Sequence, residues 1–128
     1  VYFPAHARCE DFSVAAPHMQ VWFMHEMTHV WQYQRGFSVL KSGVVLTCLG
    51  GYRHARAYQY LQAACSQIKP FHLLNMEQQA EVVAHYFAAE HLHFKQYQSR
   101  LPLLRECIRP FLNHPTWLGL LPSHSRCV

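Results

Sequence analysis

The residues whose types and spacing could do chemistry lie in one short segment, His25-Glu26-Met27-Thr28-His29. On a helix, two histidines four positions apart project from the same face and can bind one metal ion. Neutral imidazoles are good ligands of Zn²⁺, and a site with three protein ligands keeps a position for water. Zinc lowers the pKa of such a water from about 16 to about 7, and Glu26 is placed to accept its proton. The segment predicts a hydrolytic site with one zinc ion and Glu26 as the catalytic residue.

A third ligand is needed, and its position separates two arrangements of such sites. The metzincin arrangement would require glycine at position 32 and histidine at position 35, where the chain has Gln32 and Arg35, so it is excluded. A second acidic segment runs from Glu77 to Glu81, and its two glutamates share one face of a helix because they are four positions apart. We therefore expect metal ligands at His25, His29 and Glu77, with Glu81 accepting the free N–H of a ligand histidine.

Two helices must position these segments. The first is predicted to begin at Pro17, which suits a first helical turn, and to stop at Gly36. The residues around its histidines are apolar nearly all round, which is typical of a helix buried in a core. The second is predicted to begin at Asn75, where Gln78 completes a capping box, and to run to about Lys95. A buried metal-site helix packed against a second, ligand-bearing helix is the expected arrangement.

The rest of the chain is predicted to be a mixture of helix and a little strand. β-Branched residues between Phe37 and Tyr52 predict a short hairpin. A third helix is predicted from a cap at Ser99 to Asn113. No repeat, low-complexity run or linker divides residues 1–128. The expected fold class is therefore an α-rich α+β domain with a small β-hairpin or sheet.

Composition excludes several classes of protein. The 128 residues are 51% hydrophobic and only 14% charged, whereas disordered segments are poor in apolar residues and rich in charge. The most apolar stretch, Val44–Leu49, is far shorter than the roughly 20 residues of a membrane span. Eleven basic residues face seven acidic ones, giving a net charge of +4, but the basic residues are scattered and signal no nucleic-acid surface. Because carboxylates are so few, the three at Glu26, Glu77 and Glu81 are informative.

The five cysteines do not form a metal-binding or redox motif. Their number is odd and no Cys-x-x-Cys pair occurs, which argues against a thiolate zinc site. One or two disulfides would suit an oxidising compartment and five thiols a reducing one, and the sequence leaves both open.

The two segments together resemble the gluzincin metallopeptidases, whose second motif is Glu-x-x-x-Asp or Glu-x-x-Ala-Asp. The resemblance implies that Glu77 is the third zinc ligand, and that Glu81 stands where the family has an aspartate, one methylene shorter. The longer strings at residues 25–32 and 77–84 resemble more particularly the metallopeptidase toxin domains at the C-terminus of VgrG-like type VI secretion spike proteins. This similarity extends over about residues 20–90 and includes other bacterial polymorphic toxins.

The resemblance implies a secreted toxin or effector domain that acts in a target cell, with the periplasm as the expected compartment. It implies a protein or peptide substrate, a secretion-spike carrier and an immunity protein as partners. Since the sequence does not begin with methionine, we expect a domain cut from the C-terminal part of a longer secreted protein.

Two alternatives remain open at this stage. The zinc enzyme could be an amidase or peptidase acting on cell-wall peptides, or the domain could be a non-catalytic metal-binding adaptor of the spike. Glu26 favours catalysis because a binding module needs the histidines but not the base between them. His85 continues the face of Glu77 and could be a competing ligand or contact substrate. Stabilisation of an oxyanion would fall to a tyrosine or histidine, with candidates Tyr86, Tyr52 and His72.

Overall fold

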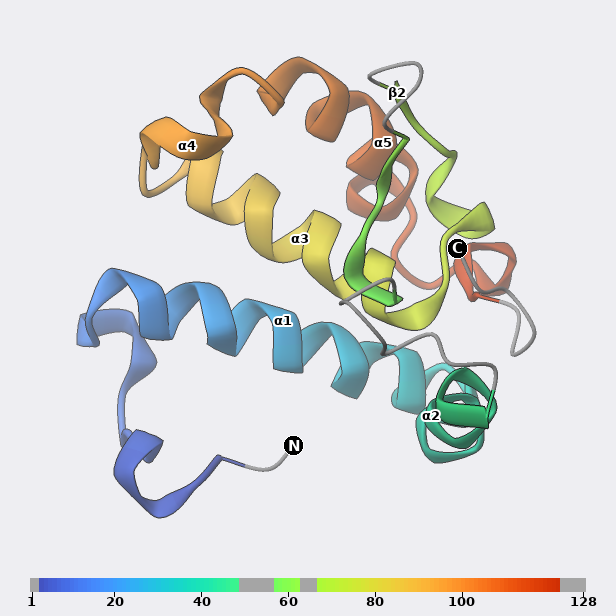
Figure 1. Cartoon of the computed structure of the whole chain (residues 1–128), viewed down its shortest axis with the longest axis horizontal. Coiled ribbons are helices and arrows are strands. Elements are labelled where there is room, and N and C mark those ends of the chain that lie inside the picture. Colours follow the sequence, from blue (N-terminus) through green and yellow to red (C-terminus); the bar gives the residue numbers. More distant parts are fainter. Residues whose placement is uncertain (1–2, 49–56, 63–66, 123–128) are drawn as a thin grey trace.

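Two long helices that lie side by side form the centre of the fold (Figure 1). The structure is a computed structural model that describes residues 3–48, 57–62 and 67–122. Helix α1 (Pro17–Gln34) carries the histidine segment, and helix α3 (Met76–Glu90) carries the acidic one. They run antiparallel, so that positions late in α1 face positions early in α3.

The other elements are short and surround this pair. Strands β1 (Leu61–Gln62) and β2 (Gln67–Ile68) form a small antiparallel sheet in which Leu61 lies opposite Ile68. The label η denotes a 3-10 helix. The helix-rich class with little strand is confirmed, and within the described residues no helix has the length and apolar character needed to cross a membrane. In chain order these elements are η1 (Ala5–Ala7), η2 (Phe12–Val14), α2 (Val39–Cys48), β1 (Leu61–Gln62), β2 (Gln67–Ile68), η4 (Phe71–Leu73), α4 (Lys95–Gln98), α5 (Leu101–Asn113) and η5 (Leu118–Leu120).

Local signals set the ends of α1 and the start of α3. Pro17 occupies the first turn of α1, where its missing N–H costs nothing. Gly36 follows the helix with φ of +91°, a left-handed conformation that favours glycine. At α3, the Asn75 side chain accepts from the Gln78 backbone N–H, and the Gln78 side chain accepts from the Asn75 N–H. The predicted capping box is thus confirmed, although α3 ends at Glu90 rather than near Lys95.

Helix α1 is half-buried, which corrects the expectation of a helix buried all round. Only Thr28 and Gln32 are fully buried, and Met27 is 38% exposed. Helix α3 covers one side of α1, and aromatic side chains of the N-terminal segment cover part of the other side. Phe12 stacks on Phe23 of α1 with ring centroids 4.5 Å apart.

The hairpin expected between Phe37 and Tyr52 is wrong, because residues 39–48 form helix α2 and residues 49–56 lie outside the described part of the chain. The Ser38 carbonyl accepts the Ser42 N–H and starts the helix. Leu46, which is fully buried, packs with Phe37 and Met76. This packing overrides the weak strand preference of the β-branched residues.

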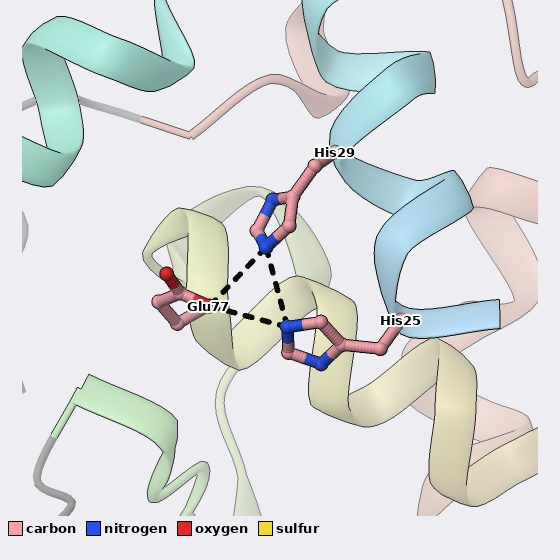
Figure 2. Close-up of side chains that lie close together, drawn as sticks. All are labelled: His25, His29 and Glu77. Atoms are coloured by element: carbon pink, nitrogen blue, oxygen red, sulfur yellow. Dashed lines mark hydrogen bonds and ion pairs between the residues drawn. The ribbon is translucent and has the colours of Figure 1, made fainter. Parts of the chain in front are cut away.

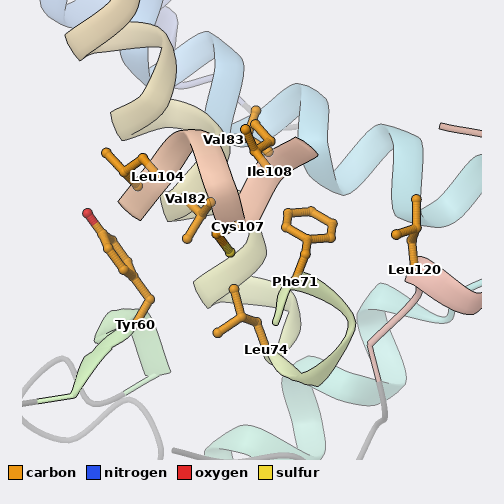
Figure 3. Close-up of a cluster of buried hydrophobic side chains, with 9 residues drawn as sticks. All are labelled: Tyr60, Phe71, Leu74, Val82, Val83, Leu104, Cys107, Ile108 and Leu120. Atoms are coloured by element: carbon orange, nitrogen blue, oxygen red, sulfur yellow. The ribbon is translucent and has the colours of Figure 1, made fainter. Parts of the chain in front are cut away.

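The main hydrophobic core lies between α3 and α5, with Phe71 of η4 and Leu120 of η5 packed into it (Figure 3). Helix α5 presents a buried stripe that includes Leu104 and Ile108. Its N-cap is Arg100 without a side-chain hydrogen bond, so the predicted cap at Ser99 is wrong, and Pro102 supplies the start instead. The core is made of Tyr60, Phe71, Leu74, Val82, Val83, Leu104, Cys107, Ile108 and Leu120.

Candidate metal centre

The structure brings together the three side chains predicted as metal ligands. His25 and His29 project from α1 toward Glu77 in the first turn of α3 (Figure 2). Nε2 of His25 lies 3.2 Å from Nε2 of His29, and Oε2 of Glu77 lies 3.3 Å from the first and 3.2 Å from the second. The three side chains are 13%, 14% and 8% exposed, and all three line one cavity.

The dimensions of this triangle fit a zinc ion. Zinc lies about 2.0–2.1 Å from imidazole nitrogen and carboxylate oxygen, and in a tetrahedron of that size the ligand atoms are about 3.3–3.4 Å apart. All three sides of the triangle are within about 0.2 Å of that spacing. Two imidazoles and one carboxylate are also a donor set of catalytic zinc sites that keep a fourth position for water. The residues present therefore fit the group that the sequence predicts.

Glu81 contacts a candidate ligand from outside the triangle. Its Oε1 lies 2.9 Å from Nδ1 of His25, and its Oε2 lies 3.0 Å from Nε2 of His85. Nδ1 of His85 in turn lies 2.7 Å from the Tyr60 hydroxyl. The chain Tyr60–His85–Glu81 thus fixes the ring of His25 with Nε2 toward the triangle. His85 is not one of the three converging side chains. It contacts Glu81, on the side of Glu81 away from His25.

The site favours positive charge. Burial acts to lower the pKa of His25, but the carboxylates of Glu77 and Glu81 outweigh it and raise the pKa to about 9. Burial acts to raise the pKa of Glu81, but hydrogen bonds with His25 and His85 lower it to about 2. The carboxylates that stabilise a protonated imidazole here would also stabilise a bound divalent cation.

A buried amide network that the sequence did not predict orients His29. The Gln79 Nε2 donates to two backbone carbonyls, which can only accept, so Oε1 of Gln79 must face the other way. That oxygen accepts from Nε2 of Gln32 at 3.0 Å, which leaves Oε1 of Gln32 facing Nδ1 of His29 at 2.9 Å. His29 therefore donates from Nδ1 and presents the lone pair of Nε2 to the triangle. The signal in the sequence was a glutamine three positions after His29, which places it on the same face of the helix.

Replacing Gln32 by leucine is expected to weaken both the fold and the site. Gln32 is fully buried, and its removal takes a side-chain donor from the Met76 carbonyl and the Gln32 donor from the Gln79 amide oxygen. We expect a loss of about 1–3 kcal/mol in the free energy of unfolding and a 10- to 100-fold weaker zinc affinity. Urea denaturation and competitive zinc titration measure the two effects. The matched control is Gln34→Leu, since Gln34 is exposed on the same helix. Equal behaviour of the two variants would contradict the orienting role.

Two cavities meet at the triangle, and Glu26 lines both. The first, of about 550 Å³, extends toward α2, and the second, of about 380 Å³, extends along α1 toward His18. His25, Glu26 and Tyr58 line both cavities, so a molecule lying across the site would pass over these residues. The Trp22 indole N–H donates to Oε1 of Glu26 at 3.2 Å and fixes the direction of its side chain.

Tyr58 is the tyrosine that the structure adds to the site. Its ring lies 6.2 Å from the ring of His25, and burial together with nearby carboxylates raises the pKa of its phenol. The earlier candidates do not share this position: Tyr86 packs against the core, and His72 lines a different cavity beside α5. Tyr52 lies outside the described residues. No motif marks Tyr58, because only the tertiary fold brings it to α1.

Comparison with known proteins gives one informative similarity. The chain is 35% identical over 91 residues to the type VI secretion system spike protein VgrG2b of Pseudomonas aeruginosa strain PAO1. The match covers 68% of this chain but 8% of that protein, so the chain spans less than a tenth of the relative's length. No protein-family model matches the chain, and no solved structure matches it.

Proposed function

We propose that this chain is a zinc-dependent peptidase domain that a type VI secretion spike carries into a target cell. The observation that carries the proposal is the triangle of His25, His29 and Glu77, whose sides match a face of tetrahedral zinc coordination. Glu26 supports a hydrolytic role, because a site that only binds metal needs no carboxylate on the wall of both adjoining cavities.

In this proposal each residue has a distinct task. Glu26, held by Trp22, accepts a proton from the attacking water and passes it to the leaving amine. Bound zinc supplies Lewis-acid chemistry, polarising the scissile carbonyl and making water acidic near neutral pH. Glu81 and Gln32 keep the two imidazoles in the orientation that points Nε2 at the metal position. Tyr58, whose raised pKa keeps its O–H in place, donates to the carbonyl oxygen as negative charge develops there.

The similarity to a spike protein supports a secretion-associated role for the chain. We propose a larger spike protein as the carrier, a protein or peptide in the periplasm of the target cell as the substrate, and an immunity protein in the producing cell. Expression in a bacterium with and without a secretion leader tests the compartment. Toxicity that requires the leader supports the periplasm, and toxicity of the leaderless form alone contradicts it.

Metal analysis combined with a peptide-library assay tests the peptidase itself. We expect one zinc ion per chain, cleavage that a chelator abolishes, and recovery on adding zinc. One zinc without cleavage of any peptide would favour a non-catalytic adaptor. Release of fragments from cell-wall peptides alone would transfer the chemistry to that substrate. Absence of bound metal would contradict the proposal.

A further inference from the structure

Helix α2 has one face in the protein and another at the candidate metal centre. Ser42 and Leu46 are fully buried, and Leu46 packs in a small core cluster. On the other side, Leu40 and Val44 are 84% and 57% exposed although both are large and apolar. They are four positions apart, so they lie on one face of the helix. Exposed apolar side chains that gather in a concave site are typical of a binding surface.

This apolar face is a wall of the larger cavity. The candidate metal ligands and Glu26 line one side of the cavity, and α2 lines another. No lining residue contributed by α2 is charged: they are Val39, Leu40, Gly43, Val44, Thr47 and Cys48. A volume of about 550 Å³ is within the range of small-ligand pockets, roughly 300–1,000 Å³. A residue bound here would thus meet apolar side chains on α2 and the reactive groups on α1 and α3.

Gly43 contributes backbone alone to this wall. It lies inside α2 and lines the cavity, although glycine within a helix is destabilising relative to alanine. The Thr47 hydroxyl donates to the Gly43 carbonyl at 2.8 Å, and both residues lie within α2. Because glycine has no side chain, the backbone of α2 itself forms this part of the cavity wall.

We infer that α2 forms the specificity subsite of the site and accepts a leucine-, methionine- or phenylalanine-sized side chain beside the scissile bond of a peptide. This inference rests on the proposed function. The cavity on the other side of His25 differs in chemistry, because His18, Glu81 and His85 line it with polar groups. Apolar selectivity therefore arises at the α2 wall. Because the α2 residues and the candidate ligands line one cavity, the occupant of this wall is a side chain of the bound peptide.

Binding of small hydroxamates tests the subsite without requiring turnover. Calorimetry on the zinc-loaded protein would compare leucine hydroxamate with glycine hydroxamate, which share the metal-binding group. We expect the leucine compound to bind roughly 10- to 100-fold more tightly. Val44→Lys should remove this preference, whereas Val14→Lys, at a position 80% exposed on η2, should keep it. Equal binding of both compounds by the wild type would overturn the inference.

Peptide cleavage separates this inference from the proposed function. We expect the wild type to prefer an apolar residue at one position flanking the scissile bond, and Val44→Lys to shift that preference toward acidic residues. Cleavage without such a preference, or equal profiles for Val44→Lys and Val14→Lys, refutes the subsite and leaves the peptidase standing. Tight leucine hydroxamate binding without cleavage refutes the peptidase and leaves the subsite. A dimer in sedimentation that Val44→Lys dissociates would assign the face to a second copy and also overturn the inference.

Discussion

Glu26→Gln is expected to lower kcat/KM by roughly two to four orders of magnitude while leaving fold and zinc binding intact, because an amide cannot accept a proton from water. The amide oxygen of glutamine can still accept the Trp22 N–H, so the local structure is preserved. Steady-state cleavage of a peptide found in the library assay measures the effect, with zinc content and thermal unfolding measured on the same samples.

The matched control for this variant is Glu106→Gln. Glu106 is exposed on α5, away from both cavities at the candidate metal centre, and undergoes the same change of charge. It should retain wild-type activity. Wild-type turnover by Glu26→Gln would show that Glu26 is not the base, and an equal loss in both variants would assign the effect to charge alone.

Metal-free and zinc-loaded protein are expected to respond to pH in opposite directions. Without metal, the pKa of His25 is raised from 6.5 to about 9, so the folded state binds more protons than the unfolded chain between these values. That stabilising contribution is complete below pH 6.5 and is lost as pH rises through about 9. With zinc bound, both imidazoles stay unprotonated at pH values below about 6.5, where the histidines of the unfolded chain take up protons. The free energy of unfolding therefore falls as pH drops from about 7 to about 5.

Zinc affinity should rise with pH over the range in which His25 loses its proton. One proton leaves His25 for each zinc bound, which corresponds to an increase of about tenfold per pH unit between pH 6.5 and 9. Thermal unfolding in chelator-buffered zinc measures both the affinity and the slopes. His6→Ala is the control, because His6 is exposed on η1 and lines neither cavity at the candidate metal centre. Melting temperatures that do not respond to zinc at any pH would contradict metal binding at the site.

Features encoded by neighbouring residues could be predicted from the sequence. Pro17 and Gly36 set the limits of α1, and Asn75 with Gln78 set the start of α3, because capping depends on residues within one turn. The spacing of His25 and His29 placed both rings on one face for the same reason. The convergence of Glu77 with them was predicted from chemistry, and the structure brings the three together, while their role as ligands stays a prediction.

Features that depend on tertiary contacts could not be predicted in this way. Helix α2 carries β-branched residues that favour strand, and the burial of Leu46 against Phe37 and Met76 decides the outcome. Gln32 and Tyr58 are positioned at the site by contacts with residues distant in sequence. Gln32 bonds to Gln79 of α3, and the ring of Tyr58 lies beside that of His25, so both contacts join residues far apart in sequence.

Anomalous diffraction at the zinc absorption edge, from crystals of the zinc-loaded protein, tests the central claim most directly. We predict a single strong peak about 2.0–2.1 Å from Nε2 of His25, Nε2 of His29 and a carboxylate oxygen of Glu77. A peak coordinated by Glu81 or His85 in place of Glu77, or no peak between α1 and α3, would contradict it.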